Sequence, residues 1–264
     1  MKIQRLSTVT YKFFSTSGKV VMVDPWLTGD PLWPLSERTT QKLSQIEVMA
    51  ITHAHFDHAA GIGEIAQHNE EVKVIAQFEY ALSLRKRGIK NAIPVGIGGT
   101  FEYQGIRFSM VSASHTNSEM TEEGNSLIVG TSAGYVIEFE DRKKVYVSGD
   151  TGLMADMKFV VGDYFKPQIS ILPVIGAFMM DPEQAAYAAN VIGSRYVIPS
   201  HDFPRDISEA ADPDGYRIFL ENSPTDGAEL NSYIMVERFM EIMKKDYPHI
   251  KVIYIPIGET IEIE

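Results

Sequence analysis

A cluster of histidines and acidic residues follows directly after a short apolar run. Val48–Ile51 leads into the sequence Thr-His-Ala-His-Phe-Asp-His-Ala-Ala-Gly at residues 52–61. His53 and His55 lie two residues apart, so in an extended segment that leaves a strand both imidazoles project to the same side, where one cation can bind both. Single histidines are usually surface or hydrogen-bonded core residues, but chance does not account for so dense a pattern. The cluster therefore predicts a metal site at the end of a strand.

The second half of the cluster predicts a second ion. Asp57 and His58 are adjacent in the chain, so they do not easily join the first pair of histidines on one cation. A turn after His55 would aim them at a neighbouring position, as in hydrolytic enzymes whose two metals lie about 3.5–4 Å apart. The chain has no cysteine, which leaves imidazole and carboxylate as the strong ligands. Zinc is the favoured ion, and manganese or iron would also fit.

Three further predicted strands end in residues that bind metals. These strands span 106–112, 144–148 and 196–199, and they lead to His115, Asp150 and His201. Taken singly, each histidine is equally well explained by an ordinary hydrogen bond. Two ions need about three or four protein ligands each, however, and the cluster supplies too few. We therefore expect His115 to complete the first site and His201 the second, while the two carboxylate oxygens of Asp150 bridge both ions.

Acidic residues are also expected to act on the attacking water and on the ligands. We assign Asp57 and Asp150 as catalytic, because Asp57 is placed to steer a hydroxide and Asp150 to set the separation of the ions. Asp24 follows the predicted strand at 19–23 and is a candidate partner for the second ring nitrogen of a ligand histidine. A turn aspartate before Pro25 explains Asp24 equally well.

Several large apolar residues lie in loops near the expected site. They are Trp26, Trp33, Phe178 and Met179. Such side chains suit the wall of a small-molecule pocket, although packing beneath the loops explains them equally well.

Hydrophobic periodicity predicts a mixed α/β chain. Strands are expected at 19–23, 48–52 and 72–76, followed by a helix at 78–87 that Gly88 ends. Antiparallel strands joined by tight turns are then expected at 100–103, 106–112, 126–130, 135–140 and 144–148. Asp181, Pro182 and Gln184 predict the capped start of a helix that ends at Gly193. A helix at 229–245 and strands at 251–256 and 260–263 complete the prediction.

Length and composition predict one domain over residues 1–264. The chain has 264 residues and 44% hydrophobic content, enough for a large core, and the irregular stretch at about 202–227 is interpreted as a surface excursion or lid. With 24 basic and 35 acidic side chains the formal charge is −11, which disfavours nucleic acid as a partner and favours a small-molecule substrate.

The sequence shows neither an apolar signal core at its start nor a segment of membrane-spanning length. We therefore expect a cytoplasmic protein without membrane insertion. Assembly into a homo-oligomer is compatible with the sequence.

Residues 52–61 resemble the signature of the metallo-β-lactamase superfamily. Further segments, at 24–31, 148–152, 172–186 and 197–201, resemble the branch that contains L-ascorbate-6-phosphate lactonase and uncharacterised bacterial metal-dependent hydrolases. The resemblance implies an α/β (α+β) fold, a four-layer αββα sandwich with the metals at one edge between the two sheets. It also implies the ligand set deduced above. The chain departs from the branch at about residues 7–9, where a Gly-His-Ser-like motif is replaced by Ser-Thr-Val.

The expected function is hydrolysis of a small ester or lactone, phosphorylated or not, by a hydroxide that bridges two metal ions. A phosphodiesterase or nuclease using the same dinuclear site is one alternative. A metal-binding sensor or scaffold without turnover is another. A redox role is disfavoured because diiron relatives prefer a glutamate where His55 stands.

Overall fold

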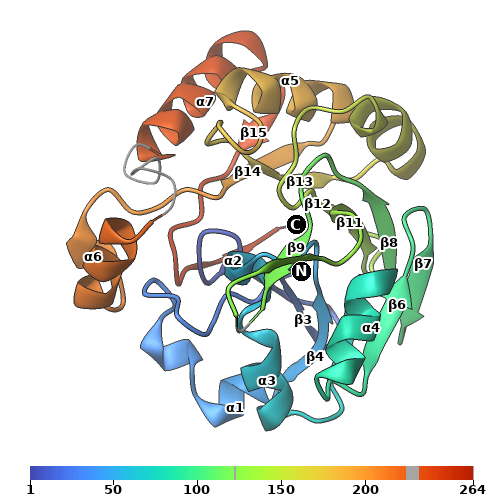
Figure 1. Cartoon of the computed structure of the whole chain (residues 1–264). Helices are drawn as coiled ribbons and strands as arrows, with labels where there is room; N and C mark the ends of the chain where they lie inside the picture. Colours follow the sequence, from blue (N-terminus) through green and yellow to red (C-terminus); the bar gives the residue numbers. More distant parts are fainter. Residues whose placement is uncertain (122, 224–231, 264) are drawn as a thin grey trace.

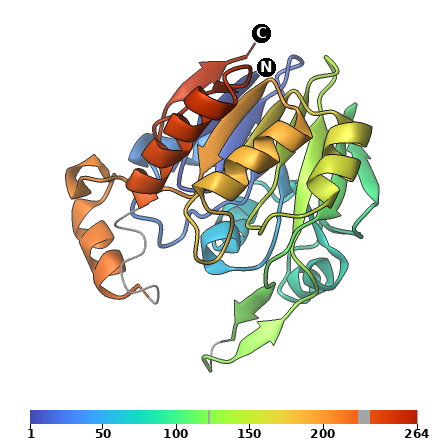
Figure 2. The ribbon, with the colours of Figure 1, turned by 90° about the horizontal axis from the view of Figure 1, so that it is seen from above.

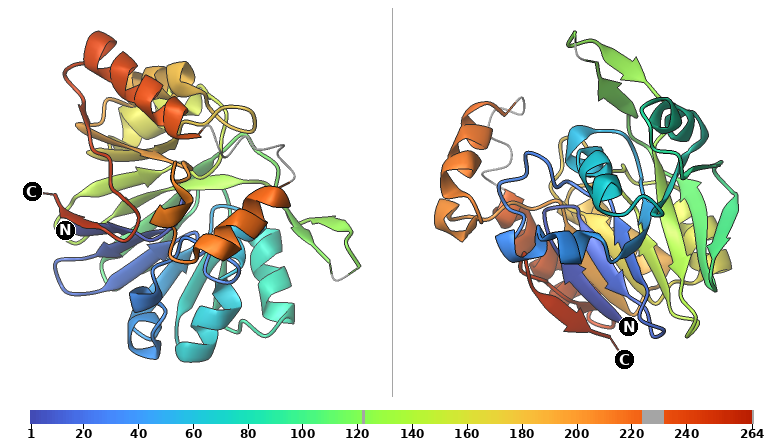
Figure 3. Two further views of the ribbon diagram at one scale, coloured as in Figure 1. Left: turned by 90° about the vertical axis from the view of Figure 1, so that its left-hand side faces the viewer. Right: turned by 90° about the horizontal axis from the view of Figure 1, so that it is seen from below.

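Two β-sheets packed face to face form the centre of the molecule. The computed structural model describes residues 1–121, 123–223 and 232–263. Within these residues each large sheet has seven strands, and helices cover the outer faces of both (Figures 1 and 3). The expected αββα sandwich is therefore confirmed.

The first sheet combines antiparallel and parallel strands in the order β16-β1-β2-β3-β4-β5-β6. The strands β3 to β6 run parallel, and their buried apolar segments are typical of strands covered on both faces. The bounds of the strands are β1 (Lys2–Arg5), β2 (Tyr11–Phe14), β3 (Val20–Val23), β4 (Ile46–Ala50), β5 (Lys73–Gln77), β6 (Ala92–Val95) and β16 (Thr260–Glu262).

The second sheet has the order β15-β14-β13-β12-β11-β8-β7. The strands β7, β8, β11 and β12 form the expected antiparallel meander, and the strands from β12 to β15 run parallel. The bounds of the strands are β7 (Thr100–Tyr103), β8 (Ile106–Ser112), β11 (Ala133–Glu138), β12 (Lys144–Val147), β13 (Ile169–Pro173), β14 (Tyr196–Ser200) and β15 (Lys251–Val252).

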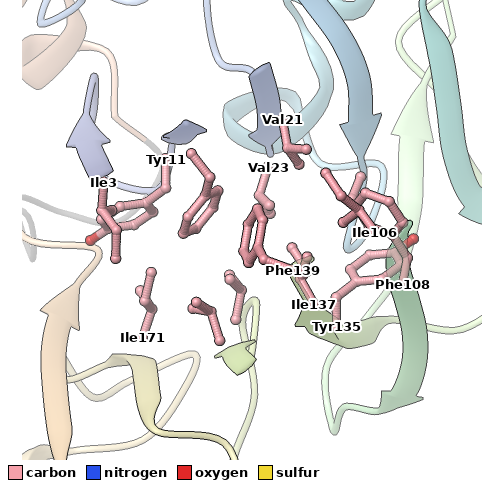
Figure 4. Close-up of a cluster of buried hydrophobic side chains, with 14 of the residues drawn as sticks. Ile3, Tyr11, Val21, Val23, Ile106, Phe108, Tyr135, Ile137, Phe139 and Ile171 are labelled. Carbon is pink, nitrogen blue, oxygen red and sulfur yellow. The ribbon is translucent and has the colours of Figure 1, made fainter. Parts of the chain in front are cut away.

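The main hydrophobic core lies between the two sheets. Figure 4 shows Ile3 and Tyr11 from the first sheet on one side of this core, with Ile106, Phe108 and Tyr135 from the second sheet among the side chains that fill it. These side chains are almost completely buried. Each such apolar side chain contributes about 1.5–3 kcal/mol when it leaves water, so the core holds the sheets in a fixed relation and thereby fixes the loops at their edges.

Helices bury apolar faces against the outside of each sheet. The first sheet is covered by helices that include α3 and α4, and the second by a π-helix together with α5 and α7. The predicted capping box of α5 is present, and Gly193 ends that helix in a left-handed conformation. The bounds are α1 (Thr40–Leu43), α2 (Phe56–Ala59), α3 (Ile62–His68), α4 (Phe78–Lys86), the π-helix (Met157–Phe165), α5 (Pro182–Ile192) and α7 (Ser232–Asp246), with a 3₁₀-helix at Leu35–Glu37. The predicted start of α7 at 229–231 lies outside the described residues.

The prediction that residues 126–130 form a strand of the meander is wrong. Strand β10 (Ser126–Ile128) pairs instead with β9 (Ser118–Met120) in a separate two-stranded ribbon, which projects from the body of the molecule (Figure 2). The side chains of β10 are all exposed, so no buried face draws this strand into the large sheet.

The stretch predicted as an excursion contains regular structure. A 3₁₀-helix at Ile207–Glu209 precedes α6 (Pro213–Glu221), which lies at the margin of the molecule (Figure 1). Buried side chains of this stretch, including Phe203 and Tyr216, form an apolar cluster with Trp26. Residues 224–227 of the predicted excursion lie outside the described residues.

Candidate metal centre

The candidate ligands lie where strands from both sheets end at one edge of the sandwich. In the first sheet β4 leads into the histidine cluster. In the second sheet β8, β12 and β14 lead to His115, Asp150 and His201. Strands β8 and β12 are both antiparallel to β11, and β12 to β14 run parallel, so all three end at the same edge. The structure brings all seven predicted ligands into three overlapping groups, each with ligand atoms within 4.8 Å of one another.

His53, His55 and His115 form what we call the outer group. The Nδ1 atom of His55 lies 3.0 Å from Nε2 of His53 and 3.3 Å from Nε2 of His115. Ring nitrogens bound tetrahedrally to zinc at about 2.0–2.1 Å would be about 3.3 Å apart. The spacing of the outer group therefore fits a single small cation.

Asp57, His58 and His201 form what we call the inner group. The Oδ2 atom of Asp57 lies 3.4 Å from Nε2 of His201 and 3.6 Å from Nε2 of His58. Asp150 adjoins both groups, because its Oδ2 atom is 3.2 Å from Nε2 of His201 and 3.8 Å from Nε2 of His115. This position suits a carboxylate shared between two ions.

Buried nitrogens without well-formed hydrogen bonds support a cation in the inner group. Among the described residues, Nε2 of His58 and both ring nitrogens of His201 are buried and form no hydrogen bond of good geometry. The two Nε2 atoms face carboxylate oxygens at 3.2–3.6 Å, and a buried polar atom without a well-formed hydrogen bond costs free energy. Coordination of a metal by these nitrogens would remove that cost, so the residues present fit the ion that the donor set implies.

Outer partners orient the ligand rings. The Nδ1 atom of His58 lies 2.8 Å from Oδ2 of Asp24, which gives the predicted partnership between Asp24 and a ligand histidine. The same carboxylate accepts hydrogen bonds from the backbone N–H and the hydroxyl of Thr52. In the outer group, Nδ1 of His115 lies 3.1 Å from the carbonyl oxygen of Phe178. These contacts leave the Nε2 atoms of His58 and His115 free to face a metal.

The outer group is a set of neutral bases. Burial lowers the pKa of His53 well below its usual value, and burial also lowers the pKa values of His55 and His115. The like charge that each ring would carry disfavours protonation of its neighbours. These imidazoles are therefore unprotonated and available as ligands at neutral pH.

The inner group instead consists of opposed charges. Burial opposes a charge on His58 and His201, yet Asp150 and the neighbouring carboxylates raise the pKa of His58 well above its usual value and that of His201 to about 10. Burial likewise opposes ionisation of Asp57 and Asp150, but the two histidines hold the pKa values of both carboxyls below the usual range. Carboxylates that remain ionised in a buried site are strong ligands for a divalent ion.

Two backbone features bring the sheet edges into contact at the site. Gly149, just before Asp150, has φ +60°, and a Cβ atom on it would lie 2.7 Å from Cβ of Thr52. Only glycine allows the loop after β12 to approach the loop after β4 so closely. His201 has φ +70°, and the neighbouring Asp202 is held by the buried side chain of Arg5 at 2.8 Å. This ion pair supports the strained backbone that carries His201.

A cavity of about 330 Å³ opens beside both groups. Three predicted wall residues, Trp26, Phe178 and Met179, line it. Trp33 does not, because it packs within the buried cluster beneath the helices of the first sheet.

Sequence reasoning missed other functional positions. Phe56, Phe203 and Phe219 also line the cavity. Phe56 lies within the cluster itself and was a visible candidate. Asn117 was also missed; its side chain accepts a hydrogen bond from the N–H of Ala54 at 2.8 Å and thereby fixes the loop between the first two ligands.

Known proteins resemble this chain in sequence and in fold. A family model described as the Beta-lactamase superfamily domain matches residues 19–201. A UPF0173 metal-dependent hydrolase from Methanosphaera stadtmanae is 38% identical over 206 residues, which is 76% of this chain and 83% of the relative. One from Rubrobacter xylanophilus is 32% identical over 200 residues, which is 76% of this chain and 81% of the relative.

Solved structures give the same result for the fold. The metallo hydrolase Igni18 from Ignicoccus hospitalis has a TM-score of 0.71 with 24% identity and covers 100% of this chain and 99% of its own. The metallo-β-lactamase fold protein YhfI from Bacillus subtilis has a TM-score of 0.64 with 12% identity and covers 99% of both chains.

Fold and sequence together place the chain in the metallo-β-lactamase superfamily and, within it, in the UPF0173 family of metal-dependent hydrolases. The comparisons do not confirm the lactonase-like branch that the sequence resemblance suggested. In the described part of the chain, no helix combines the length and the apolar character needed to cross a membrane.

Proposed function

We propose that this metal-dependent hydrolase cleaves a small ester or lactone at a centre of two divalent ions, with zinc as the favoured metal. The observation that carries the proposal is the position of Asp150, which adjoins His115 of the outer group and His201 of the inner group and lines an open cavity. One ion in each group would leave Asp150 between them, as in two-metal hydrolases.

The side chains divide the work of the reaction. When bound, such ions supply Lewis acidity, which lowers the pKa of a coordinated water from 15.7 to about 7. Asp57 lines the cavity and its carboxyl pKa is lowered by His58 and His201 against the effect of burial. It therefore remains ionised at neutral pH and accepts a hydrogen bond from the attacking water, which orients that water toward the carbonyl carbon.

Metal analysis and a substrate panel test the proposal. The metal-loaded protein should hold two ions per chain and hydrolyse an ester or lactone at neutral pH. Asp150→Asn should lower kcat/KM by about 10³-fold, equivalent to about 4 kcal/mol of transition-state stabilisation. His68→Gln is the matched control, because His68 ends α3 and belongs to none of the ligand groups.

Other outcomes would replace the proposal with one of its rivals. Turnover confined to phosphodiesters would assign the site to a phosphodiesterase or nuclease. A fully metal-loaded protein that leaves esters, lactones, thioesters and phosphodiesters intact would indicate a metal-binding sensor or scaffold.

A further inference from the structure

The polar part of the cavity lining comes almost entirely from the ligand groups. The residues that supply it are His55, Asp57, His115, Asp150 and His201. Apart from Thr116, the remaining lining residues are apolar, and among the described residues that line the cavity none is a lysine or an arginine. A substrate whose reacting group is held at the ligand residues would therefore place its remaining part against apolar side chains.

Four aromatic residues form a continuous surface, which we call the aromatic wall. The ring of Trp26 lies 5.7 Å from that of Phe56 and 5.4 Å from that of Phe219. Phe219 in turn stacks on Phe203, with 5.7 Å between ring centroids and 17° between planes. Trp26 and Phe203 are buried, so the wall is anchored in the fold and offers a preformed surface to an apolar group.

Helix α6 supplies one ring of this wall. Asp212 caps the start of the helix, because its side chain accepts a hydrogen bond from the N–H of Gly215 at 3.0 Å. The N–H of Asp212 donates to the carbonyl of Pro31 at 2.9 Å and so ties the start of the helix to another loop. Tyr216 is fully buried, and three positions later Phe219 extends the same helical face into the cavity. Ile218 lies on another face of the helix and is 60% exposed.

Charge and size both restrict what can bind. A carboxylate or phosphate on the distal end of a substrate would be buried against aromatic rings without a cationic partner, which is costly. The chain as a whole is acidic, with a formal charge of −11. The cavity of about 330 Å³ is at the small end of the usual range for ligand pockets, about 300–1,000 Å³.

We propose that the hydrolase selects a substrate whose non-reacting part is small, uncharged and apolar, such as a phenyl or short alkyl group, and that Phe219 on α6 helps to determine this selectivity. The inference rests on the proposed ester or lactone hydrolysis and narrows its substrate class. It favours an unphosphorylated substrate over the phosphorylated one that the sequence left open.

A pair of matched substrates tests the selectivity. We would compare a γ-lactone that carries a phenyl group with the same lactone carrying a 4-carboxyphenyl group, using the full-length zinc-loaded protein. The neutral lactone should have a kcat/KM higher by about 100-fold. The apolar pocket can bury a phenyl ring at little cost, whereas a buried carboxylate would have no cationic partner. Equal or preferred turnover of the carboxylate would overturn the inference.

Substitutions on α6 test the role of Phe219. Phe219→Arg should narrow the preference for the neutral lactone by about tenfold or more, since it adds a cation to the wall. Ile218→Arg adds the same charge one residue away on the exposed face and should leave the ratio unchanged. An equal change in both variants would overturn the role of Phe219. If Phe219→Arg does not fold, Phe219→Ala should still lower kcat/KM for the neutral lactone by about tenfold without loss of metal.

A binding measurement separates this inference from the proposed function. Benzohydroxamic acid and its 4-carboxy analogue bind metals through the same group and differ only in the distal charge. Titration calorimetry should give at least about tenfold tighter binding of the neutral compound. Selective binding without any turnover would remove the proposed hydrolysis and keep the pocket selectivity, whereas turnover with equal binding and equal rates would do the reverse.

Discussion

The outer and inner groups use similar residues but differ in charge and in exposure. The outer group has three imidazoles, two of them partly exposed, whose pKa values are lowered. The inner group combines an ionised carboxylate with two buried histidines whose pKa values are raised. The difference shows that the loops at one edge of the sandwich provide two neighbouring clusters of candidate ligands with unlike charge. The inner group has the greater negative charge around it, whereas more of the outer group is exposed.

Removal of one histidine from each group should give the largest effect. We expect His201→Ala to keep only the outer ion and His115→Ala to keep only the inner ion, because each variant leaves the other group intact. Metal content measured after full loading should fall from two ions to one in both, and kcat/KM should fall by about 10³-fold. Loss of both ions from either variant would show that the groups are a single cooperative site and would break the comparison.

Replacement of Asp24 should weaken the inner group selectively. Asp24→Asn removes the charge beside Nδ1 of His58 and keeps an oxygen that can accept from Thr52. Asparagine also tolerates the left-handed backbone at this position, where φ is +51°. The inner ion should bind about 10–100-fold more weakly, while the affinity of the outer ion stays the same. Competition with a chelator of known affinity measures both, and equal weakening of the two ions would contradict the assignment.

The buried carboxyl of Asp30, which interacts with the charge of Asp57, provides a test based on pH and on stability instead of metal binding. Burial raises the pKa of Asp30 from 3.8 to about 7, with a further contribution from the charge of Asp57. Between about pH 4 and 7 the unfolded chain therefore binds fewer protons than the folded one, so this residue lowers the free energy of unfolding as the pH rises.

Asp30→Asn should remove this dependence. At pH 8 the metal-free variant should be more stable than the metal-free parent by up to about 4 kcal/mol, since each pKa unit corresponds to about 1.4 kcal/mol, and the gain should be smaller at pH 5. Urea unfolding at the two pH values measures the difference. A gain of equal size at both would show that the carboxyl of Asp30 ionises normally.

Local sequence signals predicted the parts of the site that depend on short spacing. The order of residues in His53–His58 fixes which side chains can share an ion, and the capping residues of α5 fix where that helix starts. The positions of His115, Asp150 and His201 were also predictable from local signals. Each residue lies in the loop that directly follows a predicted strand.

Features that depend on packing between distant segments could not be predicted. The periodicity of α6 shows that Phe219 lies on an apolar face but not that this face meets Trp26, about two hundred residues earlier in the chain. The sequence of the short segment at Ser126–Ile128 does not reveal its pairing partner. The pairing of Arg5 with Asp202 is equally remote in sequence.

The contact between Gly149 and Thr52 lies at the seam between the two sheets, and each ligand group crosses that seam. His53 and His55 follow a strand of the first sheet, as do Asp57 and His58, whereas His115 and His201 follow strands of the second. Neither sheet can therefore assemble a complete ligand group alone. The ligands of each group come together only after both sheets have formed and packed against each other. The ability to bind metal therefore indicates that folding is complete.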